Sequence, residues 1–285
     1  MRFYSPLRYP GGKNCIFNFV SNLLEENELV GHSYAEPYAG GAGLALRLLF
    51  EEYVEKIYIN DLDVAIYAFW QTIINEPDRF CRWVDKLDVN MDAWHKYKSI
   101  YEKKNSGNLF ELAQATFFLN RTNVSGIIKG GVIGGKAQNG KYKINARFKK
   151  DVLIERIQKI ARYKNRISVS NEDGITFAKR INNMEENVFL YLDPPYYGKG
   201  ADLYMNYFSE NDHTVLSNFV KSLDKKWMVS YDNNQFILNL YSEMNRVLYK
   251  LSQSASNRVG NEVLIFSELL NFTVSINKLA EPELI

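Results

Sequence analysis

The spacing of apolar residues along the chain predicts short strands that alternate with helices. Runs of three to five mainly apolar or β-branched residues, bounded by polar or turn residues, are typical of buried strands. Such runs occupy 34–36, 56–60, 166–170, 188–192, 227–230, 247–251 and 263–266. Helix-forming or amphipathic segments lie between several of them, at 44–49, 152–161 and 235–241. The pattern therefore indicates an α/β fold.

A long stretch that begins at Val64 interrupts this alternation. Apolar residues recur there at three- and four-residue spacing, clearly in 66–74 and again in 109–119, which indicates helices. A glycine-rich, basic segment follows and lasts to about residue 150. We therefore expect one sheet domain, formed by residues 1–63 and 151–285, and a mainly helical region inserted between them at 64–150.

A glycine-rich turn joins the first expected strand to a helix. The turn, Pro37-Tyr38-Ala39-Gly40-Gly41-Ala42-Gly43, follows Glu36, and the next strand ends at Asp61, 18 residues past Gly43. An acid at about this distance can hold the ribose hydroxyls of a nucleotide. The arrangement favours a ligand that contains adenosine.

The tetrapeptide Asp193-Pro194-Pro195-Tyr196 directly follows the apolar run 188–192. Open α/β sheets bind ligands at the carboxyl ends of their strands, where Asp193 is expected to lie. An ionised carboxylate and a backbone carbonyl next to proline can accept both hydrogens of an –NH₂ group, while an aromatic ring stacks on the attached ring. The motif therefore favours a site for a planar amine. A buried strand that simply ends at two prolines would show the same sequence pattern, so this alternative stays open.

Positive charge is concentrated in one segment. The net charge is only +2, but the interval between Glu111 and Asp151 holds eight of the 35 basic residues and none of the 33 acidic ones. Glycine, amide and hydroxyl side chains are frequent there, so the segment can approach and neutralise a phosphate backbone. The candidate contacts with a nucleic acid are Arg121, Asn123, Lys129, Lys136, Lys141, Lys143, Arg147 and Lys149.

The composition limits the kinds of protein that this chain can be. With 285 residues and 46% hydrophobic content, the chain can form one large domain or a domain with an insertion. Two cysteines and three isolated histidines have no metal-ligand spacing, so we expect neither a metal nor a disulfide. No apolar signal core is visible, and no run reaches the roughly 18 residues of a membrane span. We expect a cytoplasmic, nucleoid-associated protein that works as a monomer.

Three segments together resemble the Dam-type adenine-specific DNA methyltransferases, which transfer a methyl group from S-adenosylmethionine. They are Leu7-Arg8-Tyr9-Pro10-Gly11-Gly12-Lys13, then Glu36-Pro37-Tyr38-Ala39-Gly40 with Asp61, and finally Asp193-Pro194-Pro195-Tyr196. Their order is the order in that family, which also places its target-recognition region between the cofactor half and the catalytic half. The resemblance covers nearly the whole chain. Ala42 departs from it, because the family usually has glycine there, and we expect only a small local adjustment.

The resemblance implies a Rossmann-like methyltransferase sheet with helices on both faces and an inserted, mainly helical target-recognition domain. It implies S-adenosylmethionine as cofactor, S-adenosylhomocysteine as product and no metal. The catalytic positions that it implies are Asp193, Pro194, Pro195 and Tyr196. The implied cofactor contacts are Tyr9, Lys13, Glu36, Pro37, Gly40, Asp61 and Asp193, and more loosely Asp173.

The expected substrate is duplex DNA, from which the target adenine must be flipped out before its N6 amine can react. A restriction endonuclease that acts on the same site is an expected partner. Two alternatives stay open at this point: a methyltransferase for another planar amine, such as an RNA base or a glutamine amide, and a catalytically silent DNA-binding subunit. A nicotinamide-dependent oxidoreductase fits less well, since the glycine turn lacks the full dinucleotide spacing.

Overall fold

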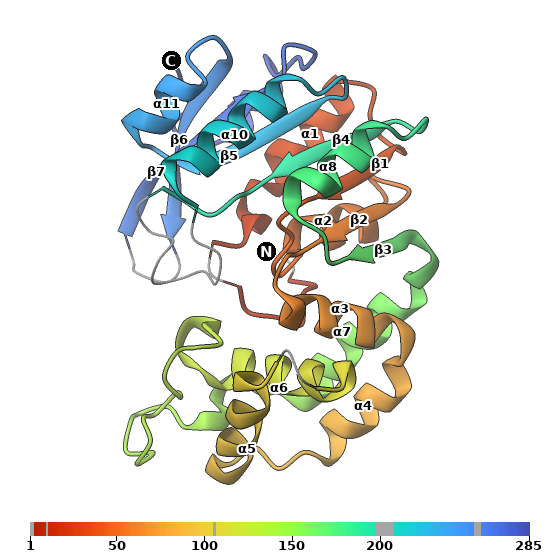
Figure 1. Ribbon diagram of the computed structural model, residues 1–285, viewed down its shortest axis with the longest axis vertical. Coiled ribbons are helices and arrows are strands. Elements are labelled where there is room, and N and C mark those ends of the chain that lie inside the picture. Colours follow the sequence, from red (N-terminus) through yellow and green to blue (C-terminus); the bar gives the residue numbers. More distant parts are fainter. Residues whose placement is uncertain (1–2, 10, 105–106, 198–207, 254–257) are drawn as a thin grey trace.

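The computed structural model describes residues 3–9, 11–104, 107–197, 208–253 and 258–285, and Figure 1 shows its arrangement. Its described part is built on an eight-stranded sheet of order β3-β2-β1-β4-β5-β7-β6-β8. Neighbouring strands from β3 to β5 are parallel, whereas β7, β6 and β8 join by antiparallel pairing. The strands are β1 (Ser33–Glu36), β2 (Ile57–Asn60), β3 (Ile167–Ser170), β4 (Val188–Leu192), β5 (Trp227–Asp232), β6 (Asn245–Gln253), β7 (Arg258–Phe266) and β8 (Glu283–Leu284).

The strand order reverses between β1 and β4, which are hydrogen-bonded neighbours in the centre of the sheet. In such sheets the crevice outside the carboxyl ends of the strands at this switch point is where ligands bind. The sheet is therefore Rossmann-like, as expected. Glu36 at the end of β1, Asp61 after β2 and Asp193 after β4 all belong to this edge.

Helices cover both faces of the sheet, as Figure 1 shows. Side chains of β4 alternate between them: Leu190 belongs to one core cluster, and Phe189 and Tyr191 belong to the other. All five residues of β4 are buried, which explains its uninterrupted apolar run. On the Leu190 side lie α8 (Gly174–Asn182), α10 (Glu210–Lys221) and α11 (Gln235–Leu240), and on the Phe189 side lie α1 (Phe17–Glu26) and α2 (Gly43–Phe50).

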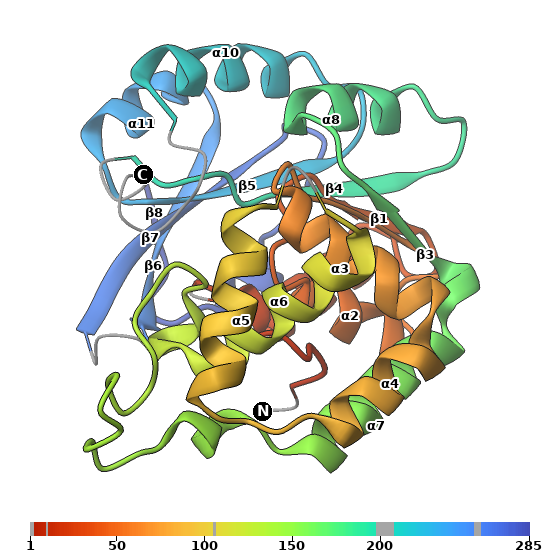
Figure 2. The same ribbon diagram turned by 60° about the horizontal axis from the view of Figure 1, so that its bottom comes forward.

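A helical unit lies beyond the carboxyl edge of the sheet, below it in Figure 1. Its helices pack in pairs, α3 with α6, α5 with α6 and α4 with α7, and Figure 2 shows α4 and α7 side by side. The helical unit is α3 (Val64–Asn75), α4 (Pro77–Lys86), α5 (Met91–Glu102), α6 (Leu109–Thr122) and α7 (Lys150–Arg162). Because α7 packs on α4 and α3, we place the end of this unit at Arg162, whereas the sequence suggested residue 150.

Polar caps and aromatic packing define the helical unit. Asp63, Asn90 and Asn108 each accept a hydrogen bond from a backbone N–H in the first turn of α3, α5 and α6, which stabilises those helix starts. Between α3 and α6 the rings of Phe69 and Phe117 stack with centroids 5.6 Å apart. The core of this unit is continuous with that of the sheet on the α1 and α2 side. The two parts therefore form one packed body.

The basic segment after α6 folds into a compact loop with two 3₁₀ turns, η2 (Val124–Gly126) and η3 (Ile144–Arg147). Gln138 ties it together, because its side-chain amide donates to the carbonyls of Ile133 and Gly135 at 2.9 Å and 2.7 Å and accepts from the Ile144 N–H at 2.8 Å. The remaining 3₁₀ turns are η1 (Lys13–Ile16), η4 (Lys164–Arg166) and η5 (Ser275–Lys278). None of the helices in the described ranges is long and apolar enough to cross a membrane.

Candidate active site

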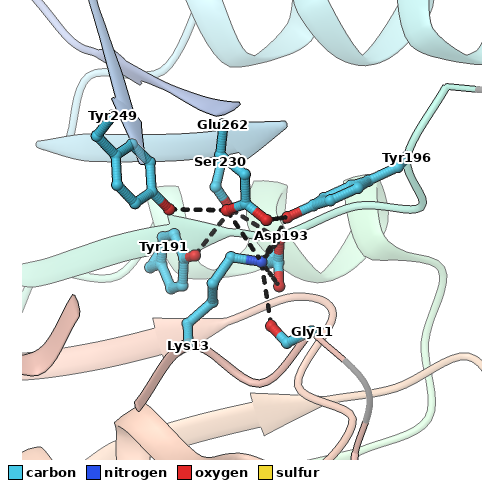
Figure 3. Close-up of polar contacts among 8 residues, drawn as sticks. All are labelled: Gly11, Lys13, Tyr191, Asp193, Tyr196, Ser230, Tyr249 and Glu262. Carbon is cyan, nitrogen blue, oxygen red and sulfur yellow. Dashed lines mark hydrogen bonds and ion pairs between the residues drawn. The ribbon is translucent and has the colours of Figure 1, made fainter. Parts of the chain in front are cut away.

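Asp193, the first residue after β4, lies at the centre of a buried polar cluster shown in Figure 3. Both of its carboxylate oxygens accept from the ammonium of Lys13, at 2.8 Å and 2.9 Å, and Oδ1 also accepts from Ser230 Oγ at 2.7 Å. Ser230 lies on the neighbouring strand β5, and its hydroxyl is 2.7 Å from that of Tyr191 on β4. Two adjacent strands therefore fix the carboxylate at the strand-order switch point.

Lys13 enters the cluster from η1, far from Asp193 in the sequence. Its side chain is 3% exposed, and its ammonium donates to the carbonyl of Gly11 at 3.2 Å and to the hydroxyl of Tyr196 at 2.6 Å. We predicted from the sequence that Lys13 contacts the cofactor. The structure brings its ammonium to the two polar side chains of the Asp-Pro-Pro-Tyr motif, so Lys13 lies at the candidate catalytic centre. Its contact with the cofactor stays a prediction.

Tyr196 is held from its hydroxyl end. The hydroxyl donates to Oε1 of Glu262 at 2.8 Å, and the other oxygen of Glu262 accepts from Tyr249 at 2.7 Å. Glu262 on β7 is 2% exposed, and its Oε2 lies 3.8 Å from the Lys13 ammonium. Neither Glu262 nor Tyr249 nor Ser230 was predicted from the sequence. The one available signal was an acid directly before the apolar run 263–266.

The two prolines connect Asp193 to Tyr196 as expected for a stiff turn. Pro194 is buried and Pro195 is half-buried. The next residue, Tyr197, donates its hydroxyl to Glu210 at 2.6 Å and stacks on Phe236 with centroids 5.1 Å apart. These contacts of Tyr197 hold the chain directly after the motif against α10 and α11.

The glycine turn after β1 is fixed by Asp61 and by two aromatic side chains. Asp61 Oδ2 accepts from the Gly40 N–H at 3.0 Å, and the Gly40 carbonyl accepts from Trp70 Nε1 of α3 at 2.9 Å. Gly40 has a φ of 46° and lies under the ring of Tyr9, where an added Cβ would come within 2.5 Å of a ring carbon. Only glycine satisfies both conditions. The structure therefore brings the predicted cofactor residues Tyr9, Gly40 and Asp61 together.

Burial raises the pKa of Asp61 to about 7. The backbone N–H of Asp63 donates to its Oδ1 at 2.9 Å, so each oxygen already accepts one hydrogen bond and keeps capacity for another. A carboxylate with this capacity beside a glycine turn fits the two hydroxyls of a ribose. The residues present therefore fit the adenosine part of S-adenosylmethionine.

Glu36 and Pro37, at the start of the glycine turn, accept hydrogen bonds from neighbouring residues. The Glu36 carboxyl accepts from the hydroxyl of Tyr34 at 3.0 Å and from the N–H of Ala45 at 3.2 Å, and burial raises its pKa to about 8. The Pro37 carbonyl accepts from Asn60 Nδ2 at 2.9 Å. Both residues thus help to hold the glycine turn in place, and direct contact with the cofactor stays a prediction for them.

Ala42, the departure from the family pattern, begins α2 with φ 44° and ψ 34°. This is the left-handed region, which costs an L-residue roughly 1–2 kcal/mol and costs glycine nothing comparable. The methyl group is nevertheless buried, at 1% exposure.

Asp173 has a structural role as the N-cap of α8. Its Oδ1 accepts from the N–H groups of Ile175 and Thr176, at 3.0 Å and 3.1 Å. The residue is exposed, and the next residue, Gly174, packs against the ring of Tyr38 in the glycine-turn segment. Proximity to the cofactor adenine stays a prediction for Asp173.

The predicted DNA contacts differ in their exposure. Six are exposed on the basic loop or at its end: Lys129, Lys136, Lys141, Lys143, Arg147 and Lys149. Asn123 is different, because it is 0% exposed and its side chain accepts from Trp94 Nε1 at 2.8 Å and donates to the carbonyls of Ile127 and Ile128. Asn123 therefore holds the loop to α5, and we withdraw it from the candidate DNA contacts.

Arg121 lies at the base of the loop and donates to the carbonyl of Arg147. Burial and the nearby guanidinium groups of Arg8, Arg156 and Arg147 lower its pKa to about 9. A cavity of about 190 Å³ opens beside it, lined in part by Arg121, Arg147, Lys149 and Arg156. Guanidinium groups this crowded favour an anion between them.

A second cavity of about 320 Å³ adjoins the first, because both are lined by Arg147 and Ala146. Lys141 and Tyr142 lie on its rim, and the Tyr142 side chain is 57% exposed. Elsewhere in the described ranges, no group of three or more His, Cys, Asp or Glu side chains is placed to hold a metal ion. The basic surface is thus a cationic hollow with an exposed aromatic ring.

Comparisons with known proteins identify the family of the chain. A family model described as D12 class N6 adenine-specific DNA methyltransferase matches residues 9–255. A type II methyltransferase, M.CviBI of Paramecium bursaria Chlorella virus NC1A, is 24% identical over 237 residues, which are 81% of this chain and 86% of that protein.

Solved structures with similar folds include a proposed RNA methyltransferase from Pyrococcus horikoshii, with 12% identity, a TM-score of 0.42, and coverage of 92% of this chain and 85% of that chain. Another is M. capricolum TrmK in complex with S-adenosyl-homocysteine, with 9% identity, a TM-score of 0.35, and coverage of 87% and 68%. Since the family model spans most of the sequence, the resemblance predicted from the motifs is confirmed: the chain belongs to the D12 class N6 adenine-specific DNA methyltransferase family.

Proposed function

We propose that this DNA adenine methyltransferase modifies one short sequence in duplex DNA, with S-adenosylmethionine as methyl donor and Asp193 as the acceptor for the target N6 amine. The observation that carries the proposal is the position of Asp193. It follows β4 at the strand-order switch point, where β4 pairs with β1, the strand that leads into the glycine turn, and it shares the Lys13 ammonium with Tyr196.

The cofactor supplies a methyl group that is already activated by its sulfonium, so the protein has to supply geometry. Asp61 and the Gly40 turn hold the adenosine part, and Tyr9 covers the turn. Placing the amine against the methyl group in a near-attack arrangement can contribute about 7–11 kcal/mol. The proton of the amine can leave after transfer, so Asp193 acts as an acceptor that orients the amine.

Asp193 has to share its oxygens with the incoming amine. In the structure Lys13 donates to both oxygens and Ser230 donates to Oδ1. A carboxylate has about four lone-pair sites, so one amine hydrogen can be accepted while Ser230 and Lys13 stay in contact. The carbonyl of Pro194 accepts the second amine hydrogen in this proposal, and the ring of Tyr196 stacks on the purine.

Duplex DNA hides the target amine, so the adenine is flipped out at a cost of a few kcal/mol. Contacts to the phosphate backbone offset that cost, and the cationic hollow beside Arg121 and Arg147 provides them. Exposed lysines of the basic loop extend the same surface. The resemblance to a type II methyltransferase supports the proposal that a restriction endonuclease recognising the same DNA sequence is a partner.

The test is to express the protein in cells that lack DNA methylation and to map modified adenines in their genome by single-molecule sequencing. We expect N6-methyladenine in one short sequence context, absent from cells that express Asp193→Asn. Methylation scattered without a common context would contradict site specificity. An unmodified genome, with soluble protein that binds S-adenosylmethionine, would contradict the proposal as a whole.

A further inference from the structure

Glu262 is a buried acid that none of the recognised motifs contains, yet it contacts the catalytic motif directly. It lies on β7, opposite Tyr249 of β6 and Asp232 of β5 in the strand register. We propose that Glu262 is a positioning residue for methyl transfer, which orients the ring of Tyr196 through the tyrosine hydroxyl. The inference rests on the proposed role of Tyr196 as the ring that stacks on the flipped adenine.

The fold alone does not require an acid at this position. Residues 263–266, which follow on the same strand, are apolar and fully buried. Burial of a carboxylate costs several kcal/mol unless good partners compensate, and an apolar residue of similar size would often be at least as stable. The partners of Glu262 are the hydroxyls of Tyr196 and Tyr249 and, at 3.8 Å, the Lys13 ammonium. Two of these three partners belong to the catalytic centre.

The hydrogen bonds restrict the Tyr196 ring from its far end. The hydroxyl donates to Glu262 at 2.8 Å and accepts from Lys13 at 2.6 Å, as Figure 3 shows. A phenol oxygen with both a fixed acceptor and a fixed donor leaves the ring little freedom to swing about its Cβ. Tyr249 fixes the second oxygen of Glu262 from the paired strand, so the position of the ring is set by the sheet itself.

Loss of the Glu262 charge should therefore affect the chemical step more than binding. Glutamine has one acceptor oxygen and one donor NH₂, so it cannot accept from both tyrosine hydroxyls as the carboxylate does. A ring displaced by a fraction of an ångström stacks the adenine off line with the methyl group, and misplacement of about 1 Å can cost about 100-fold in rate.

The experiment measures single-turnover transfer of tritiated methyl from S-adenosylmethionine to unmethylated plasmid DNA, with enzyme in excess. We expect Glu262→Gln to lower this rate at least about 10-fold, while the dissociation constants for S-adenosylhomocysteine and for DNA change less than about threefold. Glu186→Gln is the matched control, because Glu186 also accepts a hydrogen bond from a tyrosine hydroxyl, that of Tyr58. Glu186 lies just before β4, at the end of this strand that is opposite to Asp193. The control should keep the wild-type rate.

A double-mutant cycle separates positioning from a general loss of stability. If Glu262 acts through the Tyr196 hydroxyl, Tyr196→Phe already removes the contact, and adding Glu262→Gln should lower the rate by less than the product of the two single effects. Effects that multiply would overturn the inference, and so would a wild-type rate in either single variant.

A second variant covers the case in which Glu262→Gln does not fold. Tyr249→Phe keeps the charge and the ring volume and removes one of the two hydroxyls that hold Glu262, so the single-turnover rate should fall in the same direction. An unchanged rate in Tyr249→Phe would then overturn the inference. The wild-type reaction distinguishes failure of the proposed function from failure of this inference. No transfer by the wild-type enzyme would refute the proposed function, whereas equal transfer by wild type and Glu262→Gln would refute only the role of Glu262.

Discussion

The ammonium of Lys13 lies 2.8 Å and 2.9 Å from the two carboxylate oxygens of Asp193, a residue 180 positions later in the chain. The Lys13 side chain is 3% exposed and that of Asp193 is 24% exposed, so solvent screens the pair only in part. This contact joins the first sequence motif to the last one. It also means that the acceptor proposed for the target amine is already engaged by a cation.

Substitution of Asp193 should separate catalysis from binding. We expect Asp193→Asn to lower methyl transfer at least about 100-fold, because an amide offers one acceptor oxygen where the carboxylate offers two. DNA affinity should stay within about threefold of wild type, since the basic loop is untouched. Tritium transfer and a DNA-binding titration measure the two quantities. Retained transfer would exclude Asp193 as the acceptor.

The raised pKa of Glu36 predicts a pH-dependent stability. In the unfolded chain this carboxyl has its ordinary pKa of 4.5, whereas burial, and to a lesser degree the charge of Asp193, hold the folded pKa at about 8. Between these pH values the unfolded chain binds fewer protons, so stability falls as the pH rises. Glu36→Gln should flatten the fall between pH 5 and 8, as measured by urea unfolding. An equally steep dependence in the variant would mean that Glu36 does not hold its proton.

Part of the pH dependence should persist in Glu36→Gln. The pKa of Asp61 is also raised, to about 7, so Asp61 contributes in the same direction over a narrower range. The exposed residue Glu186 offers the control, and Glu186→Gln should leave the profile of the wild type unchanged.

Asp61 should control cofactor affinity. Asp61→Asn replaces one acceptor oxygen with an NH₂ group, which is a donor. Because both oxygens of Asp61 accept from backbone N–H groups, those of Gly40 and Asp63, the substitution should weaken both the ribose contact and the glycine turn. Loss of a hydrogen bond to a charged group costs about 1.5–3 kcal/mol. The dissociation constant for S-adenosylhomocysteine should therefore be roughly 10- to 150-fold larger in the variant. Calorimetric titration would measure it, with Asp224→Asn as a control on the exposed surface. An unchanged affinity would remove Asp61 from the cofactor site.

Wild-type cofactor affinity should also rise with pH near neutrality. The Asp61 pKa of about 7 means that the ionised acceptor forms as the pH passes through this value. The same titrations at pH 6, 7 and 8 should show the rise in wild type and its absence in Asp61→Asn. A rise of equal size in the variant would assign it to another group.

The basic loop should set the salt dependence of DNA binding. Replacement of Lys141, Arg147 and Lys149 by alanine removes three exposed positive charges beside the two cavities. Each lost phosphate contact lowers the slope of log affinity against log salt by about 0.9, so the slope should fall by roughly 2 to 3. A triple variant at Lys164, Lys179 and Lys278 carries the same charge change outside the loop. Equal slopes in the two variants would show that the DNA binds elsewhere.

Local patterns predicted most of the sheet and the strand-end acids. The run 188–192 was predicted with the bounds that β4 has, because all five side chains are buried and the prolines stop the strand. Asp61 was assigned to the nucleotide site from its spacing to the glycine turn, and its hydrogen bond with Gly40 follows from the parallel alignment of β1 and β2. These features depend on neighbours in the sequence or on a known order of strands.

Features that depend on distant packing were not predictable. The helix α7 was assigned to the sheet domain, because an amphipathic pattern does not say which surface a helix covers. The helices α1, α8 and α10 were also missed, although their sequences carry local helix signals. Asn123 looked like a loop residue available to DNA, but Trp94 and two backbone carbonyls enclose it. Glu262 lacked any motif, and its role follows only from the antiparallel register of β6 and β7.

The short segment before η1 limits how this enzyme could be recombined with its relatives. The backbone N–H of Arg8 donates to Asn120 Oδ1 and its carbonyl accepts from Asn120 Nδ2, both at 2.7 Å, while an added Cβ on Gly126 would collide with the same carbonyl. Four residues before Lys13, Tyr9 covers the Gly40 turn. We therefore predict that transplanting residues 64–162 alone would leave residues 3–9 mismatched to the new helical unit, so that a folded hybrid has to exchange residues 3–9 together with it.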